Sequence, residues 1–399
     1  MSTLAPTMRA LLSLLLFISI YSHAQVDSIP YHADHTDDIT CISFSPNSKY
    51  IVTGSWDQSI VIHKNDSLAQ VVQTLEGYKG AVNSLAFSRD GFKMIAGGQD
   101  GRLNIYSIND SLFDFATLDT TLQINESQIN KLIYGPGMRT IFSAGDDGRF
   151  LTYDLAKEKV IPMRGSRPIS AAAVAIDRMS YFIAVEGRAT ITQVDIFGKV
   201  INIFEGHSND VTDLLVTVDR KYLISSSKDK TVRVWEIANA KEETVFNDHT
   251  WAVTDIDMDP FGIYLVSGGL DGVANLYNLK DRTKLKTQEL PGYKINAIAI
   301  SPDNTQIAAA AQIEGEAKSA GYFIIDTDLK PRKVVLPKQF DIEQVKRKNR
   351  EKKAKKEKKD KETAASNTSS DPSFDKKQKP NEKVIKATEQ VKITIQDNE

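Results

Sequence analysis

The sequence contains one cysteine, Cys41, and only six histidines among its 399 residues. A single thiol cannot form an intrachain disulfide, and it cannot supply a cysteine-based zinc cluster. Metal sites need several histidine, cysteine or carboxylate ligands close together. The sequence signatures of a zinc-protease helix, a nucleophile elbow and a P-loop are missing as well. We therefore expect no bound metal, no cofactor and no catalytic activity.

A long hydrophobic run is also missing. The main apolar stretch, Ala10–Ile20, has 11 residues, whereas a membrane-spanning helix needs about 20. Arg9 precedes this stretch and Ser22-His23-Ala24 follows it, which is the pattern of a secretory signal peptide cleaved after Ala24. The sequence thus predicts a signal peptide at residues 1–24, with Met1 or Met8 as the start. Export to the periplasm or the exterior follows, and a cytoplasmic or nuclear location is the alternative.

Positive and negative charges are unevenly divided along the chain, although its net charge is only −2. Residues 338–399 contain 18 Lys and Arg against 12 Asp and Glu, which gives this part a net charge of +6. The other 32 basic and 40 acidic residues give residues 1–337 a net charge of −8. An acidic body with a basic tail indicates two parts with different partners.

What the sequence does contain is a repeat. A motif of small residues, an aspartate, two turn residues and an alternating strand occurs five times, at Asp57, Asp100, Asp147, Asp229 and Asp271. Upstream, a β-branched residue that opens another alternating strand occurs seven times, at Ile39, Val82, Ile129, Ile169, Val211, Val253 and Ile295. These seven anchor residues are spaced by 43, 47, 40, 42, 42 and 42 positions. The chain therefore contains seven units, of which the fourth and seventh lack the aspartate.

Each unit reads as four short strands separated by turns rich in Pro, Asp, Asn and Gly. Four short antiparallel strands in every ~40–45 residues describe one blade of a β-propeller. We predict an all-β fold, a seven-bladed β-propeller with four-stranded antiparallel blades at residues 25–337, followed by a Lys-rich flexible tail at 338–399 that is disordered or helical. Residues 26–32 or 332–337 supply the outermost strand of the seventh blade. We favour 332–337, because it follows the third strand of that blade directly.

The most regular unit, GHSNDVTDLLVTVDRKYLISSSKDKTVRVWEIA at residues 206–238, resembles the WD40-repeat family. It contains the family's Gly-His pair, the turn aspartate Asp229 and an aromatic-acidic end, Trp235-Glu236. The chain departs from the family pattern in two ways. No blade ends in a literal Trp-Asp pair, and Tyr78 replaces the histidine of the second blade.

The resemblance implies a hydrogen-bonded tetrad of His, Ser or Thr, Asp and Trp inside a blade. The corresponding positions are His207, Ser225, Asp229 and Trp235 in the fifth blade, His249, Ser267, Asp271 and Tyr277 in the sixth, and His35, Thr53, Asp57 and His63 in the first. Such a set has the composition of a catalytic triad. Because it recurs in several blades, we interpret it as a structural element and not as an active site.

The resemblance also implies that partners dock on one face, formed by the loops before the first strand and between the second and third strands of each blade. The side chains expected on or near this loop face are Trp56, Gln99, Asp146, Lys228, Leu270, Trp251, Tyr78 and Tyr293. Trp and Tyr are typical interface anchors, although Trp56 could instead pack against a neighbouring blade. We predict a monomeric propeller that acts as a non-catalytic, protein-binding scaffold. The alternative is an enzyme-like ligand or metal site in the central channel.

The segment Lys346–Lys361 has 11 basic and 3 acidic residues among 16. Its Glu–Lys pairs at i and i+4 are compatible with a solvated helix. Three roles stay open for it: a solvated tail, a contact to an anionic surface or nucleic acid, and a nuclear-localisation patch. Near the C-terminus, the alternating sequence VKITI at residues 391–395 is suited to adding as a strand to a partner's sheet.

Overall fold

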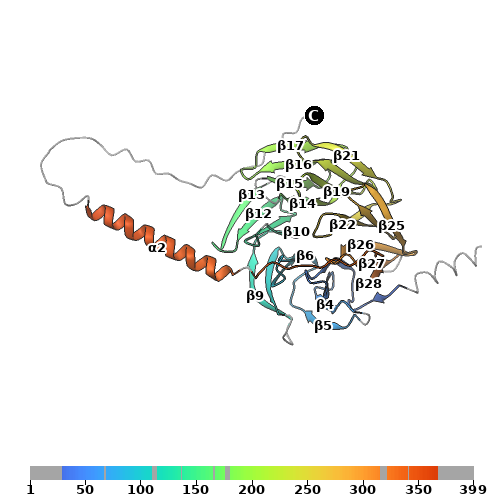
Figure 1. The fold of residues 1–399 in the computed structure, drawn as a ribbon, viewed down its shortest axis with the longest axis horizontal. Coiled ribbons are helices and arrows are strands. Elements are labelled where there is room, and N and C mark those ends of the chain that lie inside the picture. Colours follow the sequence, from blue (N-terminus) through green and yellow to red (C-terminus); the bar gives the residue numbers. More distant parts are fainter. Residues whose placement is uncertain are drawn as a thin grey trace, which may run out of the picture.

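Seven four-stranded antiparallel sheets stand around a central axis in the computed structural model (Figure 1). The structure describes residues 29–66, 69–109, 115–135, 137–164, 167–175, 180–314, 321–339 and 341–366. The prediction of a seven-bladed propeller with four strands per blade is therefore confirmed. The expected signal peptide at residues 1–24 and the segment 391–395 lie outside the described residues.

The first four blades follow the chain from the inner to the outer strand. Blade 1 contains β2 (Ile39–Phe44), β3 (Tyr50–Ser55), β4 (Ile60–Lys64) and β5 (Val71–Leu75); blade 2 contains β6 (Val82–Phe87), β7 (Lys93–Gly98), β8 (Arg102–Ile108) and β9 (Ala116–Gln123). Blade 3 contains β10 (Ile129–Tyr134), β11 (Thr140–Gly145), β12 (Arg149–Asp154) and β13 (Lys159–Arg164); blade 4 contains β14 (Ile169–Val174), β15 (Ser180–Val185), β16 (Ile191–Asp195) and β17 (Val200–Phe204).

Blades 5 and 6 repeat this order, and blade 7 differs in its outer strand. Blade 5 contains β18 (Val211–Val216), β19 (Tyr222–Ser227), β20 (Val232–Glu236) and β21 (Lys241–Phe246); blade 6 contains β22 (Val253–Met258), β23 (Tyr264–Gly269), β24 (Val273–Asn278) and β25 (Thr283–Glu289). Blade 7 contains β26 (Tyr293–Ile300), β27 (Gln306–Ile313), β28 (Gly321–Asp326) and, as its outer strand, β1 (Tyr31–His32).

Six inner strands begin with their β-branched anchor, whereas β26 of blade 7 begins two residues before its anchor Ile295; each strand makes a β-bulge directly after the anchor. In blade 1, Ile39 pairs with Ser55 and Cys41 with Gly54, which leaves Thr40 as the extra residue. The same shift occurs after the anchor in the other six inner strands. A bulge frees the extra residue from the ladder and redirects its side chain. In this protein that side chain turns toward the next blade.

The bulged residues join consecutive blades by hydrogen bonds. In six of the seven units, the bulged side chain donates to the backbone carbonyl of the next blade's anchor. The donors are Thr40 to Val82, Asn83 to Ile129, Asn130 to Ile169, Ser170 to Val211, Thr212 to Val253 and Thr254 to Ile295. These bonds satisfy carbonyls on the inner edge of each sheet, where no further strand is present to pair with them.

The hydrophobic core lies between neighbouring blades. At the junction of blades 7 and 1, Ile39 and Ile51 of blade 1 pack in one buried cluster with Ala297 and Tyr322 of blade 7. Similar clusters fill other junctions, and the second strand of blades 1, 3 and 4 is buried along its whole length. Stability thus comes from sheet-on-sheet contacts around the ring, because each blade exposes its outer strand.

The closing strand of the ring comes from the N-terminal side, so the prediction that residues 332–337 close blade 7 is wrong. Tyr31 pairs with Phe323, and their rings lie 4.7 Å apart, with Tyr293 also 5.8 Å from Tyr31. The aromatic contacts favour this closure. Residues 327–339 form no strand in the structure.

After β28, the chain crosses the ring and reaches helix α2 (Ile342–Ser366), as Figure 1 shows. Residues 333–337, here called the strap, line the channel mouth together with the ends of several inner strands. At the helix start, the backbone N–H of Gln344 donates to the Asp341 carboxylate at 2.8 Å, which is an N-cap contact. Among the helices of the described residues, none is long and apolar enough to cross a membrane.

Because β1 closes the ring, a substitution in β1 should destabilise the protein more than a substitution in the strap. Tyr31→Ala removes the aromatic contacts of the closing strand, and we expect it to lower the free energy of unfolding by about 2–3 kcal/mol. Val335→Ala, in the strap, removes a side chain that is 79% exposed and should change it by less than about 0.5 kcal/mol. Urea denaturation followed by tryptophan fluorescence measures both. Equal losses in the two variants would contradict this closure.

Candidate functional site

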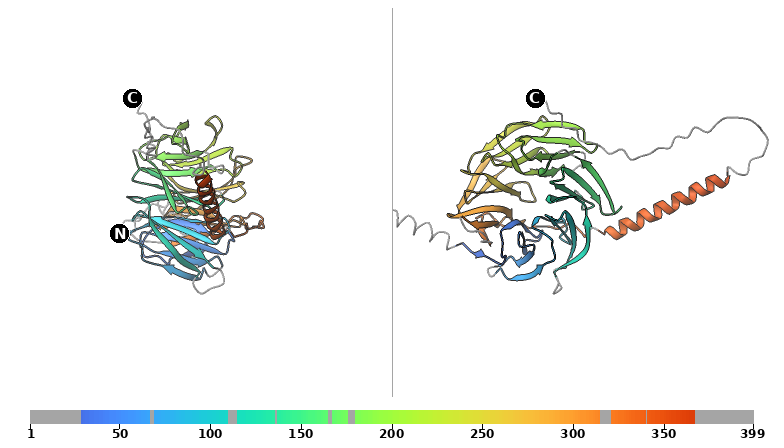
Figure 2. Two further views of the ribbon diagram at one scale, coloured as in Figure 1. Left: turned by 90° about the vertical axis from the view of Figure 1, so that its left-hand side faces the viewer. Right: turned by 180° about the vertical axis from the view of Figure 1, so that it is seen from behind.

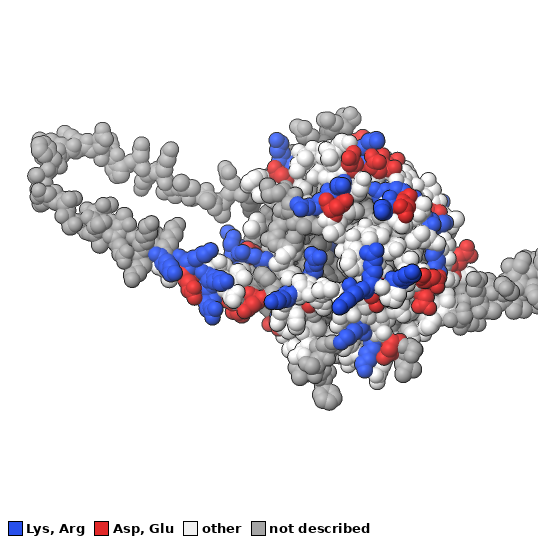
Figure 3. Space-filling model, in the orientation of Figure 1, with Lys and Arg blue, Asp and Glu red and all other residues white. Residues whose placement is uncertain are grey.

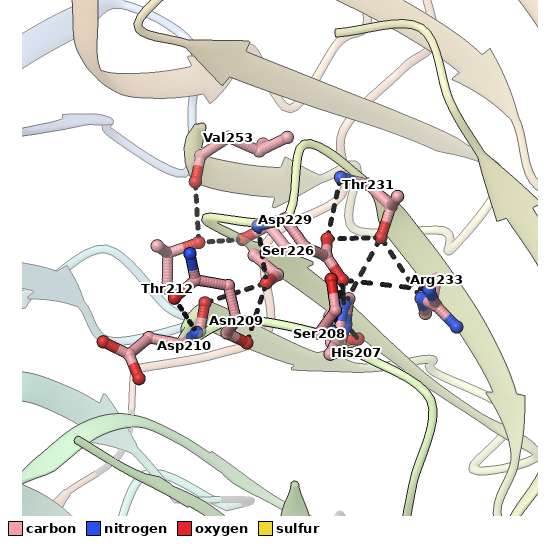
Figure 4. A network of polar contacts seen from close by, with 12 residues as sticks. His207, Ser208, Asn209, Asp210, Thr212, Ser226, Asp229, Thr231, Arg233 and Val253 are labelled. Carbon is pink, nitrogen blue, oxygen red and sulfur yellow. Dashed lines mark hydrogen bonds and ion pairs between the residues drawn. The ribbon is translucent and has the colours of Figure 1, made fainter. Parts of the chain in front are cut away.

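The fifth blade contains a connected chain of polar side chains. The Trp235 indole N–H donates to Ser225 Oγ at 2.8 Å. Ser225 Oγ lies 2.7 Å from His207 Nε2, and His207 Nδ1 lies 2.7 Å from Asp229 Oδ2 (Figure 4 shows the His207–Asp229 end). A hydroxyl donating to Nε2 and an Nδ1–H donating to the carboxylate give each of these atoms a partner. Trp235, Ser225, His207 and Asp229 thus form, in this order, a hydrogen-bonded network inside one blade.

Asp229 also holds the turn between β19 and β20. Its carboxylate accepts hydrogen bonds from the Thr231 hydroxyl at 2.7 Å and from the Ser208 backbone N–H at 3.0 Å. Burial opposes ionisation of this carboxyl, but the hydrogen bonds from His207 and Thr231 outweigh it and lower the pKa of Asp229 well below its usual range. The ionised side chain therefore stabilises the turn that leads onto the loop face.

The sixth blade has a similar network with one substitution. His249 Nε2 lies 2.7 Å from Ser267 Oγ, and its Nδ1 lies 3.1 Å from Asp271 Oδ1. Tyr277, at the tryptophan position, is fully buried, but its hydroxyl has no hydrogen-bond partner. The Asn275 side-chain amide instead approaches His249 Nε2 at 3.2 Å. The His–Ser–Asp part of the network is thus present here without the aromatic donor.

In the first blade, His35 Nε2 lies 2.8 Å from Thr53 Oγ1 and His35 Nδ1 lies 2.8 Å from Asp57 Oδ2. His63, which we expected at the tryptophan position of this tetrad, instead pairs with Asp34 at 2.8 Å. Its ring also lies 5.1 Å from Tyr322 of blade 7. His63 therefore connects blade 1 to the closing blade and does not complete the tetrad.

Five of the residues expected on the loop face make the same backbone hydrogen bond, each in its own blade. The N–H of the residue before each turn donates to the carbonyl of the residue before the anchor. These bonds run from Trp56 to Asp38, Gln99 to Ala81, Asp146 to Gln128, Lys228 to Asp210 and Leu270 to Ala252, at 2.9–3.1 Å. Glu186 makes the same bond to Pro168 in blade 4 at 2.9 Å. Glu186 was not predicted for this face, because blade 4 lacks the turn aspartate that marks the position in the other blades.

The residues expected on the loop face differ in how much of each side chain is exposed to solvent. Trp56 of blade 1 is 50% exposed, and Trp251, before the inner strand of blade 6, is 55% exposed. The Lys294 ammonium lies 5.9 Å from the centre of the Trp251 ring. Tyr293 is partly buried, and its ring packs edge-on against Phe323 at 4.9 Å. The exposed aromatic surface on this face therefore belongs to the two tryptophans.

Tyr78 does not lie on the loop face, which corrects our expectation. Its side chain is 7% exposed, and its hydroxyl lies 2.6 Å from that of Tyr106. Tyr78 takes the place that histidine has in blades 1, 5 and 6, so its ring points into the blade and pairs with the aromatic residue of the third strand. Burial is the main reason that the pKa of Tyr78 is raised well above its usual range.

The inside of the channel carries a charged layer that the sequence reading overlooked. It is formed by residues two positions after each anchor: Cys41, Ser84, Lys131, Ala171, Asp213, Asp255 and Ala297. The Lys131 ammonium of blade 3 lies 2.7 Å from the Asp213 carboxylate of blade 5. This ion pair reaches past blade 4, where the small Ala171 leaves room. This layer was not predicted, because only the anchors recur in the sequence, whereas the residues two positions after them differ from blade to blade.

Two further carboxylates of the channel bind the inner strand of blade 7. Asp255 accepts from the Ile298 N–H and Asp257 from the Ile300 N–H, both at 2.9 Å. Burial raises the pKa of both side chains, to about 6 for Asp257, and the neighbouring Asp213 carboxylate adds to the effect at Asp255. Among the residues that the structure describes, no group of three His, Cys, Asp or Glu side chains is placed to hold a metal ion.

Each mouth of the channel opens into a cavity. On the loop face, a cavity of about 370 Å³ is lined by several bulged residues and by Asp146, Glu186 and Lys228. At the opposite mouth, a cavity of about 620 Å³ lies under the strap. Lys131 of the charged layer and the nearby Asp257 line the second cavity and not the first.

Seven repeated four-stranded blades around a channel define a β-propeller. The family model for "WD domain, G-beta repeat" matches residues 27–64, 69–107, 198–236 and 240–278. Each match covers the inner three strands of blade 1, 2, 5 or 6 together with the outer strand of the preceding blade, and the four include all three His–Ser/Thr–Asp networks. The chain belongs to the WD40-repeat β-propeller family.

The relatives are distant, and each match covers only part of either chain. Periodic tryptophan protein 2 homolog of Caenorhabditis elegans is 23% identical over 59% of this chain and 24% of its own length. A chromatin assembly factor 1 subunit from Gallus gallus is 22% identical over 63% of this chain and 37% of its own. Eukaryotic translation initiation factor 3 subunit I of Aspergillus terreus is 31% identical over 28% and 32%, respectively. The chain thus spans between about a quarter and two fifths of the length of these relatives.

The channel carboxylate predicts a pH-dependent gain in stability. Because the pKa of Asp257 is about 6 in the fold and about 3.8 when unfolded, its ionisation opposes folding fully above about pH 6 and not at all below about pH 4. Asp257→Asn should therefore raise the free energy of unfolding at pH 8 by up to about 3 kcal/mol, and by nothing near pH 4. Urea denaturation between these pH values measures the difference.

Asp229→Asn is the matched control, because its pKa is shifted in the opposite direction. Ionised Asp229 stabilises the fold above the unfolded pKa, so this variant should lose about 1–3 kcal/mol at pH 7. That loss should shrink as the pH falls below about 4, where ionised Asp229 gives progressively less stability. The same pH trend in both variants would refute the assignment of opposite shifts.

Proposed function

We propose that this WD40 propeller is a non-catalytic scaffold that binds a protein partner on its loop face, with Trp56 and Trp251 as the main contacts. The observation that carries the proposal is the exposure of about half of each indole in a protein whose other tryptophan, Trp235, is buried. Trp and Tyr are enriched among residues that dominate binding energy at interfaces. An indole that served only to pack against the next blade would be covered.

The arrangement of the loop face supports a partner with a defined orientation. Trp56 lies on blade 1 and Trp251 on blade 6, so blade 7 stands between them. The backbone bonds from the residues before the turns fix where these side chains start, so little ordering is needed on binding. Asp146 and Glu186 at the channel mouth add negative charge, which favours a partner with basic groups opposite the mouth.

A non-catalytic role is supported by the hydrogen bonds that the potentially reactive side chains make to one another. The histidines, hydroxyls and carboxylates of the tetrads are bonded to one another inside the blades, and the same arrangement occurs three times. The fold shared with relatives named for chromatin assembly and translation initiation also favours a role within assemblies. We propose that a single propeller ring is the binding unit.

The sequence pattern and the relatives favour different locations for this protein. The N-terminal pattern alone argues for export, whereas relatives named for chromatin assembly and translation initiation favour the alternative inside the cell. The proposed scaffold role needs neither location. If export occurs, N-terminal sequencing of the protein from its own cells should find Gln25 first; a protein that starts at Met1 or Met8 would place it inside the cell.

The proposed contact face predicts the effect of a double substitution. Trp56→Ala combined with Trp251→Ala should weaken partner binding at least tenfold, since truncating one such anchor typically costs about 2 kcal/mol. Partners recovered with the wild-type protein would be identified, and their affinity measured by isothermal titration calorimetry. Phe92→Ala combined with Phe197→Ala removes exposed aromatic surface elsewhere and should leave the affinity unchanged. Equal affinity of wild type and the tryptophan variant would remove the loop face from the proposal.

A further inference from the structure

Helix α2 is attached to the propeller at its start and then leaves it. The Lys346 ammonium lies 2.5 Å from the Glu158 carboxylate, which follows β12 in blade 3. Beyond this point, Figures 1 and 2 show the helix projecting away from the ring. With 25 residues at about 1.5 Å each, the helix is about 37 Å long. Its attachment leaves most of this length accessible.

The exposed part of α2 is positively charged on every side. The exposed cationic side chains after Lys346 in the described part are Arg347, Lys348, Arg350, Lys352, Lys353 and Lys355. At 3.6 residues per turn, these six point in all directions around the helix axis. Figure 3 shows Lys and Arg side chains gathered along this part of the helix. Glu351 is the one acidic residue among them, paired with Arg347 at 4.0 Å.

This distribution does not suit a flat anionic surface such as a membrane. A helix that inserts into a membrane surface needs one apolar face to bury at the headgroup boundary. Between Glu343 and Lys355, only Val345 and Ala354 are apolar. On a plane, at least two of the six cations would also point away from the negative charges, whichever way the helix lies. A partner that surrounds the helix with negative charge uses all of them.

The major groove of B-form DNA is such a partner. It is about 12 Å wide and 8.5 Å deep, and it accepts an α-helix of about 10–12 Å diameter between two rows of phosphates. The major groove of an RNA duplex is too narrow for this. We propose that α2 binds double-stranded DNA by lying in its major groove, with its cations contacting the phosphates on both sides. The contacts are to phosphates, so binding is not selective for base sequence.

The adjoining surface of the propeller is compatible with this approach. Arg89 and Lys333 line the channel mouth under the strap, and the Arg332 guanidinium lies 5.1 Å from the centre of the Phe261 ring beside it. This mouth is opposite the loop face, where Asp146 and Glu186 line the channel. Because the exposed part of α2 projects away from the ring, duplex DNA bound along it stays away from these carboxylates. A protein partner on the loop face and DNA on α2 can bind together.

Binding of the full-length protein to a fluorescent duplex of about 20 base pairs, which is longer than α2, tests the proposal by anisotropy. The variant Lys352→Gln, Lys353→Gln, Lys355→Gln keeps residues with high helix propensity and removes three charges from α2. We expect it to bind at least tenfold more weakly at about 0.1 M salt. Its plot of log K against log salt concentration should be less steep by up to about 3.

The matched control removes three exposed lysines from the propeller: Lys79→Gln, Lys230→Gln and Lys280→Gln. It has the same net charge as the helix variant, and it should bind DNA as the wild type does. The double variant Trp56→Ala, Trp251→Ala should also bind DNA as the wild type does. The DNA-binding proposal and the loop-face proposal can therefore fail independently of each other. Equal weakening by the helix and control variants would overturn the role of α2.

Two further probes distinguish the major groove from other anionic partners. An RNA duplex of the same length should bind at least tenfold more weakly than the DNA. Vesicles containing phosphatidylserine, compared at equal anionic charge, should bind more weakly than the DNA as well. Equal affinity for the RNA duplex would overturn binding in the groove, and tighter binding to the vesicles would identify α2 as a membrane contact.

Discussion

Six hydrogen bonds from bulged side chains to the next blade's anchor carbonyl hold the inner strands at a fixed spacing around the channel. Each depends on two adjacent sequence features, a β-branched anchor that packs into the junction between blades and a polar residue directly after it. The anchor fills the junction, and the bulge turns the polar side chain across it. Because the loops before the inner strands on the loop face lead into these strands, the relative positions of those loops follow from the same contacts. The tetrads act further out, where they stiffen the turns within single blades.

The channel shows how a repeated backbone carries side chains that differ between copies. Position +2 after the anchor is Lys in blade 3, Ala in blade 4 and Asp in blades 5 and 6. The alanine lets the lysine reach the aspartate two blades away, and the aspartate of blade 6 bonds the backbone of blade 7. Ionisation of the buried carboxylates opposes folding, whereas the buried Asp229 of a tetrad favours it. The difference lies in the partners: Asp229 accepts hydrogen bonds from side chains in its own blade, while burial dominates at Asp255 and Asp257.

The fold could be predicted from sequence because its determinants are local and repeated. The anchors, the turn residues and the period near 42 are all visible within one unit, and so are the residues of the His–Ser–Asp networks. Features that depend on distant parts of the chain were missed. Tyr78 was placed on the surface because its pairing with Tyr106 is not visible from spacing. Glu186 was missed because the loop-face residues were predicted from the turn aspartates, and blade 4 has none. The channel layer joins blades that are not neighbours, and no pattern within a unit indicates that.

The position of the closing strand has a consequence for how the chain folds during synthesis. Tyr31 pairs with Phe323, so the two sides of the seventh blade are 292 residues apart in sequence. Closing so long a loop has an entropic cost, and contacts between distant residues form late. After β1 leaves the ribosome, it must therefore wait for β28, its partner in blade 7, until nearly the whole ring has been made. Until then its tyrosine and the edge of β28 are both open to other chains, so newly made protein is most exposed to misassembly just before the ring closes.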